Sequence, residues 1–109
     1  MRNIKEEILS WHKETLPNAT EWAVVDKLVE EVEELNNALW AYTRGGRTAK
    51  SEAEMLDEIA DVFIVATRYI DMRSEGEVSI LDIIEKKMER NKQRVWGPED
   101  ANGDRWRVK

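Results

Sequence analysis

The sequence contains no cysteine, only two prolines and only five glycines. Without cysteine there is no disulfide, no thiol nucleophile and no thiolate metal site, so a bound metal would need oxygen ligands or the single histidine. The few prolines and glycines leave long uninterrupted segments between them, which favours helices over many short strands. These shortages predict a helical protein without sulfur chemistry.

Positive charge and long apolar runs are also scarce. The formal net charge of -6 argues against a nucleic-acid-binding protein that works through a general basic surface. No run approaches the roughly 20 apolar residues of a membrane-spanning helix, and the N-terminal segment lacks the apolar core of a signal peptide. We therefore expect a cytoplasmic protein that binds neither nucleic acid nor a membrane.

The length and composition indicate a small folded unit. A chain of 109 residues has the size of one domain and buries only a modest core unless it oligomerises. Its 41% hydrophobic and 37% charged content suit a small helical protein with much surface. We predict a single domain over residues 1–109 that forms oligomers.

Periodicity and turn residues place four helices. They are expected at about residues 3–14, 20–43, 51–73 and 80–95, with an irregular tail at 97–109. Asn18 and Ser51 begin capping-box patterns for the second and third helices. The third helix is apolar around most of its circumference and is expected to be the buried one. Residues 105–108 are expected to pack back as a short extended piece.

The second helix combines an apolar stripe with four closely spaced glutamates. At roughly 100° per residue, the stripe contains Val25, Leu28, Val32, Leu35, Leu39 and Tyr42. With Leu28 as its centre, Glu31 lies roughly 60° away and Glu34 roughly 120° away on the same flank. Glu30 and Glu33 point to the opposite side and are expected to be solvated. Glu31 and Glu34 therefore form a pair, one turn apart, at the edge of the stripe.

A second apolar flank on the same helix contains Trp22, Val29 and Trp40. Two apolar faces on one helix indicate contacts with two neighbours, one of which could be another subunit.

The third helix places a second acidic pair, Glu58 and Asp61, within an apolar arc. An unpaired buried carboxylate costs several kcal/mol, so a cation is expected nearby. Side-by-side packing of the second and third helices would bring Glu31 and Glu34 together with this pair. Four oxygen donors without sulfur suit Mg²⁺, or Mn²⁺, better than zinc. Because Mg²⁺ favours phosphate ligands, a nucleotide or another polyphosphate is the expected substrate.

The fourth helix supplies cations for such a substrate. Lys87, Asn91 and Arg94 share one face, and the helix is locally basic whereas the second helix is locally acidic. Lys87 and Arg94 could therefore neutralise phosphate oxygens. Further candidate substrate contacts are Lys27, His12, Trp11 and Trp40. A base could stack on Trp11, Trp40 or Trp96.

Each group also has a purely structural interpretation. Glu31 and Glu34 could be solvated or ion-paired, and Glu58 and Asp61 could form a salt bridge with Lys27 or Arg68. Lys87 and Arg94 could be ordinary surface charges, and Asn91 could be a satisfied core amide. His12 has no second histidine to complete a site, which favours a packing or surface role.

Three motifs in order resemble a known family. They are Glu-Glu-x-x-Glu at residues 30–34, Glu-x-x-Asp at 58–61, and Lys-x-x-x-Asn-x-x-Arg-x-Trp at 87–96. Together they are similar to the MazG-like all-α nucleotide pyrophosphohydrolases, from about Lys27 to Gly97.

The resemblance implies a bundle-like all-α fold that forms a homodimer or homotetramer, with Mg²⁺ held by Glu31, Glu34, Glu58 and Asp61. It further implies hydrolysis of a nucleoside triphosphate between the α and β phosphates, giving monophosphate and pyrophosphate. Lys87, Asn91 and Arg94 would contact the phosphates or the nucleoside. Two other classes stay open: a regulatory protein that binds a nucleotide or alarmone without cleaving it, and a structural helical oligomer.

Overall fold

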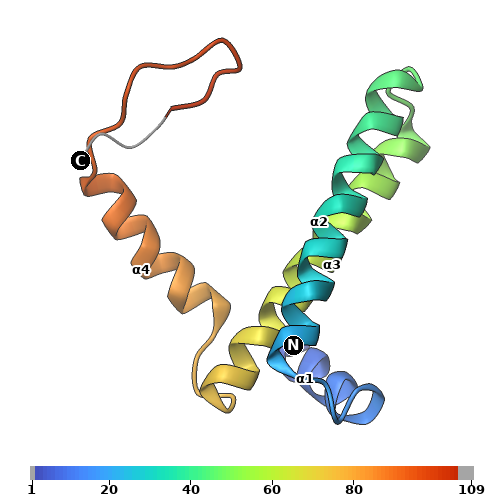
Figure 1. The fold of residues 1–109 in the computed structure, drawn as a ribbon, viewed down its shortest axis with the longest axis vertical. Helices are drawn as coiled ribbons and strands as arrows, with labels where there is room; N and C mark the ends of the chain where they lie inside the picture. The colour runs from blue at the N-terminus through green and yellow to red at the C-terminus, as the bar shows by residue number, and fades with distance from the viewer. Residues whose placement is uncertain (1, 106–109) are drawn as a thin grey trace. The chain divides into compact units, whose positions relative to one another are not determined.

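The computed structural model describes residues 2–105 and contains four helices (Figure 1). They are α1 (Ile4–Thr15), α2 (Glu21–Arg44), α3 (Ala49–Ser74) and α4 (Ile80–Gln93). Residues 2–105 form no strand, so the predicted all-α class with four helices is confirmed. The extended piece predicted at residues 105–108 lies, apart from Arg105, outside the described residues. No helix in the described range is long and apolar enough to cross a membrane.

Contacts within the chain divide it into two compact units, Met1–Ser79 and Ile80–Lys109. The first unit contains α1, α2 and α3, and the second contains α4 and the segment that follows it. The single-domain organisation over residues 1–109 stays a prediction.

The capping residues of α2 and α3 differ from the predicted ones. Pro17 and Asn18 still belong to the turn after α1, so the Thr20 hydroxyl caps α2 by accepting from the Ala23 amide at 3.1 Å. Thr48 caps α3 by accepting from the Ser51 amide at 3.1 Å, so that helix begins two residues earlier than predicted. In both cases a threonine directly before the first helical turn takes the capping position.

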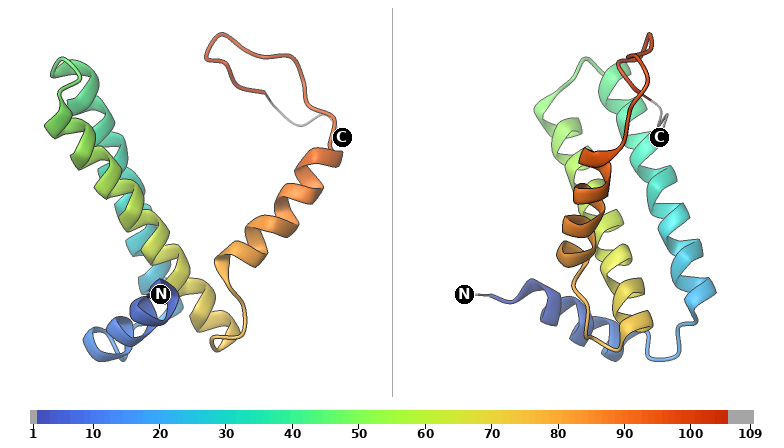
Figure 2. Two further views of the ribbon diagram at one scale, coloured as in Figure 1. Left: turned by 180° about the vertical axis from the view of Figure 1, so that it is seen from behind. Right: turned by 90° about the vertical axis from the view of Figure 1, so that its left-hand side faces the viewer.

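In the first unit, α2 and α3 lie side by side as an antiparallel pair, and α1 packs against α3 (Figures 1 and 2). Gly46 follows α2 with φ +85°, a left-handed conformation that suits glycine and lets the chain reverse. Lys5 joins α1 to the segment after α3, because its ammonium donates to the carbonyls of Gly76 and Val78, each at 3.2 Å. The buried apolar side chains of this core are Val24 on α2 and Val65 on α3.

The buried face of α2 is rotated from the predicted stripe. Val24 and Glu31 are buried, whereas Val32 and Leu39, two members of the stripe, are 48% and 46% exposed. At about 100° per residue, the buried direction lies roughly 50° from Leu28 on the Glu31 side. The predicted centre was wrong because packing against α3 buries the Glu31 side of the stripe, whereas Val32 and Leu39 lie on the side nearer the second apolar flank and stay exposed. This rotation moves Glu31 from the edge into the helix interface.

The other apolar flank of α2 is open in the single chain. Trp22 is 81% exposed, and Val29 and Trp40 are also largely exposed. The helix α3 carries more buried residues than any other described helix, as expected, but Ile59 and Phe63 remain about half exposed. The helices of the first unit therefore leave these apolar side chains uncovered.

Candidate functional site

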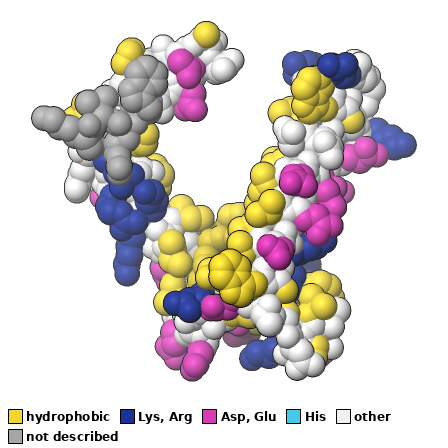
Figure 3. Space-filling view, viewed as in Figure 1, with side chains coloured by type: hydrophobic (Ala, Val, Ile, Leu, Met, Phe, Trp, Pro, Cys, Tyr) yellow, Lys and Arg dark blue, Asp and Glu magenta, His cyan; other side chains and the backbone are white. Residues whose placement is uncertain are grey.

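Three carboxylates from two helices form a cluster in the first unit. Glu31, Glu34 and Glu58 each offer one oxygen atom, and these atoms all lie within 4.8 Å of one another. Glu31 is 5% exposed, while Glu34 and Glu58 are half-buried. Glu30 and Glu33 are exposed, so the predicted separation of the four glutamates by helical phase is confirmed. Figure 3 shows acidic side chains gathered along the α2 and α3 part of the molecule.

The cluster contains oxygen atoms with no hydrogen-bond partner. Glu31 Oε2 and Glu58 Oε2 are both buried and unpartnered. An unsatisfied buried carboxylate oxygen is costly, and a cation placed between the helices would remove that cost. The donor set consists only of carboxylate oxygens, which Mg²⁺ and Mn²⁺ prefer. These residues therefore fit a divalent hard cation.

Lys27 is the one cation that contacts the cluster among the described ion pairs. Its Nζ lies 3.0 Å from Glu31 Oε1 and 3.6 Å from Glu30 Oε2. The hydrogen bond to Glu31 raises the pKa of Lys27. The structural alternative that paired Lys27 with Glu58 or Asp61 is wrong, because the i, i+4 spacing on α2 brings Lys27 to Glu31 instead. The i, i+4 spacing of Lys27 and Glu31 is a local sequence signal that predicts this ion pair.

The pKa of Glu34 is raised by the neighbouring carboxylates. A hydrogen bond with the Glu31 carboxyl group raises the pKa of Glu34, and the charges of Glu31 and Glu58 and partial burial raise it further. Lys27 acts in the opposite direction. Like charges that share one site favour protonation or a bound cation.

Asp61 is the predicted ligand that the single chain does not bring into the cluster. It is exposed and lines a cavity of about 460 Å³ between α1 and α3, together with Ile8, Trp11 and Ile64. Asp61 lies one turn after Glu58 on α3, but none of the three cluster residues lines this cavity. The role of Asp61 as a metal ligand stays a prediction.

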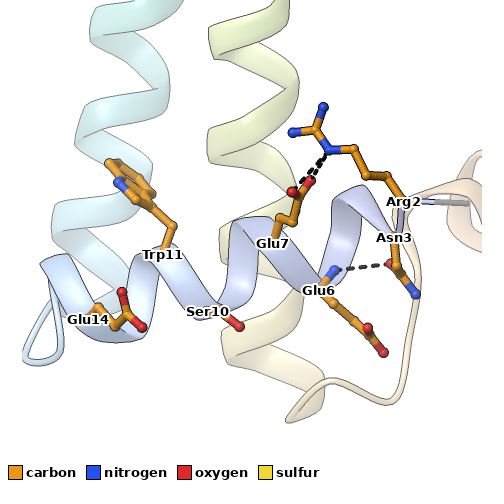
Figure 4. Close-up of a pocket in the computed structure, with 7 residues that line it drawn as sticks. All are labelled: Arg2, Asn3, Glu6, Glu7, Ser10, Trp11 and Glu14. Carbon is orange, nitrogen blue, oxygen red and sulfur yellow. Dashed lines mark hydrogen bonds and ion pairs between the residues drawn. The ribbon is translucent and has the colours of Figure 1, made fainter.

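Trp11 and His12 are neighbours on α1 but line different cavities. Trp11 is about half exposed and lines the cavity with Asp61. Trp11 also lines an outer hollow of about 490 Å³ on α1, where it projects from the same side of the helix as Glu7, whose carboxylate accepts from Arg2 (Figure 4). His12 is buried and lines a third cavity, of about 430 Å³, together with Asp71.

His12 is part of a buried polar network that the sequence did not reveal. Arg68 Nε donates to His12 Nδ1 at 2.8 Å, and both side chains are buried. Burial lowers the pKa of His12, the charge of Arg68 lowers it further, and Asp71 opposes the shift. The alternative that placed Arg68 against Glu58 or Asp61 is therefore wrong. The two partners are 56 positions apart, so no local pattern signals their contact.

The remaining candidate substrate residues lie elsewhere in the chain. On α4, in the second unit, Arg94 donates to Asn91 Oδ1 at 3.2 Å, and the Trp96 indole donates to the Asn91 carbonyl at 3.0 Å. Lys87 lies on the same helix. Trp40 lies near the end of α2 with the Arg44 guanidinium 4.3 Å from its ring centre. The substrate contacts assigned to these residues stay predictions.

Comparison with known proteins adds one result. No curated protein and no solved structure matches the chain. A family model, the MazG nucleotide pyrophosphohydrolase domain, matches residues 19–96, a range that includes α2, α3 and α4. The match contains the whole carboxylate cluster and Lys87, Asn91 and Arg94, so the chain belongs to the family of MazG nucleotide pyrophosphohydrolase domains.

Proposed function

We propose that this protein is a Mg²⁺-dependent nucleoside triphosphate pyrophosphohydrolase. It cleaves a ribo- or deoxyribonucleoside triphosphate between the α and β phosphates and releases the monophosphate and pyrophosphate. Its role is control or house-cleaning of the nucleotide pool in the cytoplasm. Family membership supports the reaction class. The observation that carries the proposal for this chain is the cluster of Glu31, Glu34 and Glu58 with its unpartnered buried oxygens.

In this proposal Glu31, Glu34 and Glu58 hold the metal, and Asp61 joins them as a fourth ligand. A bound Mg²⁺ would neutralise phosphate charge and lower the pKa of a water molecule. Glu34 is less buried than Glu31 and is therefore the carboxylate assigned to orient the attacking water or accept its proton. Direct attack by water requires no covalent intermediate.

The cavity beside Asp61 is the proposed place for the base. Its wall combines the Trp11 ring with the aliphatic side chains of Ile8 and Ile64, which suits a flat apolar ring system. Lys87, Asn91 and Arg94 would contact the phosphates, with Lys27 and Trp40 as further candidates. His12 on α1 accepts a hydrogen bond from Arg68 on α3. This contact favours a role for His12 in holding α1 against α3 over direct contact with the substrate.

The uncovered apolar surface supports a homodimer or homotetramer. Trp22, Val29 and Val32 on α2 and Ile59 and Phe63 on α3 are all about half exposed or more in one copy of the chain. Burial of such a surface against a second copy would be favourable. Light scattering coupled to size-exclusion chromatography measures the oligomeric state, and a strictly monomeric protein would contradict this part of the proposal.

The decisive experiment measures pyrophosphate release from a panel of ribo- and deoxyribonucleoside triphosphates in the presence of Mg²⁺. Glu58→Gln keeps the size of the side chain and removes its charge, so turnover should be lost. Asp57→Asn, on the exposed neighbouring position, is the matched control and should stay active. Absence of turnover with every nucleotide and metal, or full activity of Glu58→Gln, would contradict the catalytic proposal. Saturable nucleotide binding without product would instead support the regulatory class.

A further inference from the structure

Lys27 forms an ion pair with Glu31, the most buried carboxylate of the cluster, and both residues lie on α2. Its Nζ lies 3.0 Å from Glu31 Oε1, and the Glu31 side chain is 7% exposed whereas the Lys27 side chain is 42% exposed. The ion pair therefore joins a buried anion to a cation that can reach solvent. One face of the Glu31 carboxylate is neutralised, and its other oxygen stays buried and unpartnered.

The charge balance of the site follows from this contact. Three carboxylates converge within 4.8 Å, and Lys27 offsets one of their charges. A buried carboxylate next to two others would otherwise raise the free energy of the metal-free fold. The same ammonium repels any divalent cation that approaches the same oxygens. Lys27 therefore stabilises the metal-free site and weakens its attraction for a free metal ion.

Lys27 has alternative partners when it leaves Glu31. It already lies 3.6 Å from Glu30 Oε2, and the Glu30 side chain is 58% exposed. A flexible lysine on the rim of the site can also reach a phosphate oxygen of a bound nucleotide. The free-energy cost of separating the Lys27 ammonium from Glu31 is consequently lowest when a phosphate group is present to bind that ammonium.

We propose that Lys27 is a built-in counter-cation that competes with the divalent metal for Glu31 and thereby couples metal binding to nucleotide binding. The inference rests on the metal site proposed above. It predicts that the free metal ion binds weakly and that the metal together with the nucleotide binds better than either alone. The coupling is reciprocal, because each ligand must raise the affinity of the other by the same factor.

The test is calorimetric titration of the whole 109-residue chain with Mn²⁺ alone. Lys27→Met should bind Mn²⁺ roughly fivefold more tightly than the wild type, as expected when a partly exposed ion pair is removed. Lys27→Arg keeps the charge and should resemble the wild type. Lys50→Met removes an equal charge from an exposed position of α3 and should leave the affinity unchanged. Lys27→Gln, checked for helical content by circular dichroism, repeats the test if the methionine variant folds poorly.

A second titration measures the coupling. The wild type should bind Mn²⁺ more tightly when an α,β-imido analogue of a nucleoside triphosphate is present, and Lys27→Met should show a smaller increase. Equal Mn²⁺ affinities for the wild type and Lys27→Met would overturn the role of Lys27 and leave the metal site standing. Weaker Mn²⁺ binding by Lys27→Met would also overturn it. If the wild type binds no Mn²⁺, or if Glu31→Gln binds it equally well, the proposed metal site itself is wrong.

Discussion

Glu31 on α2 and Glu58 on α3 place carboxylate oxygens within 4.8 Å of each other across a helix interface, and the Oε2 atom of each is buried without a partner. A buried and a half-buried carboxylate in this relationship repel each other and destabilise the metal-free fold. Helices that pack only for stability would place apolar side chains at these positions. The α2–α3 interface therefore contains negative charge that a bound cation would balance.

The helical phase of α2 predicts which of its glutamates are needed for activity. Glu31→Gln and Glu34→Gln should each lower metal-dependent pyrophosphate release by at least about a hundredfold, because in the proposed site each removes a charge that would bind the metal or orient water. Glu33→Gln changes an exposed side chain on the same helix and should retain activity. Steady-state rates of the three purified variants give the comparison. Similar losses of activity in all three variants would contradict the separation of these glutamates by helical phase.

The raised pKa of Glu34 predicts how the stability of the metal-free protein depends on pH. Because the pKa in the fold lies above its usual value of 4.5, the folded state holds this proton more tightly than the unfolded state does. The stabilisation is complete below the usual pKa and is lost as pH rises through the raised pKa of the folded state. Urea denaturation across this range should show a decline in the free energy of unfolding that Glu34→Gln lacks.

Mn²⁺ should change this behaviour, since the metal ion and the proton compete for the same carboxylate. The affinity for Mn²⁺ should fall as pH is lowered through the raised pKa of Glu34. Glu33→Gln is the matched control for the denaturation series. A decline in stability that persists in Glu34→Gln would assign the pH dependence to another group.

Trp11 should affect substrate binding more than the chemical step. Stacking of a base on an aromatic ring contributes about 1–3 kcal/mol, so Trp11→Ala should raise KM roughly tenfold with a smaller change in kcat. Trp11→Phe keeps a ring and should recover part of the loss. Trp40→Ala provides the comparison, because Trp40 lies near the far end of α2. An effect on KM confined to Trp40→Ala would move the base away from the cavity beside Asp61.

The buried pair of His12 and Arg68 should contribute to stability. His12→Leu leaves the Arg68 Nε–H without its acceptor at a buried position, which should lower the free energy of unfolding by about 2–3 kcal/mol. Urea denaturation of the metal-free protein measures this difference. Adding Arg68→Met to His12→Leu should restore part of the loss, because the unpaired cation is removed. Lys13→Ala, at the exposed neighbouring position, is the control, and an equal loss there would contradict the assignment.

The sequence by itself determined the helices and the phase of the acidic residues. Scarce glycine and proline and the spacing of apolar residues predicted four helices, and their number and type are confirmed for residues 2–105. Helical geometry alone separated Glu31 and Glu34 from Glu30 and Glu33. The three motifs predicted the family that the match to residues 19–96 confirms. All of these follow from local spacing, which a single helix fixes without reference to its neighbours.

The tertiary structure decided which face of each helix is buried and which distant residues meet. The sequence could not show which side of the α2 stripe is buried, and packing against α3 placed Glu31 in the interface while Val32 stayed exposed. The same packing joined Glu58 to the cluster, left Asp61 on a neighbouring cavity, and bonded Arg68 to His12. The physical reason is that a periodic pattern fixes angles around one helix axis, whereas contacts between helices depend on how two axes pack.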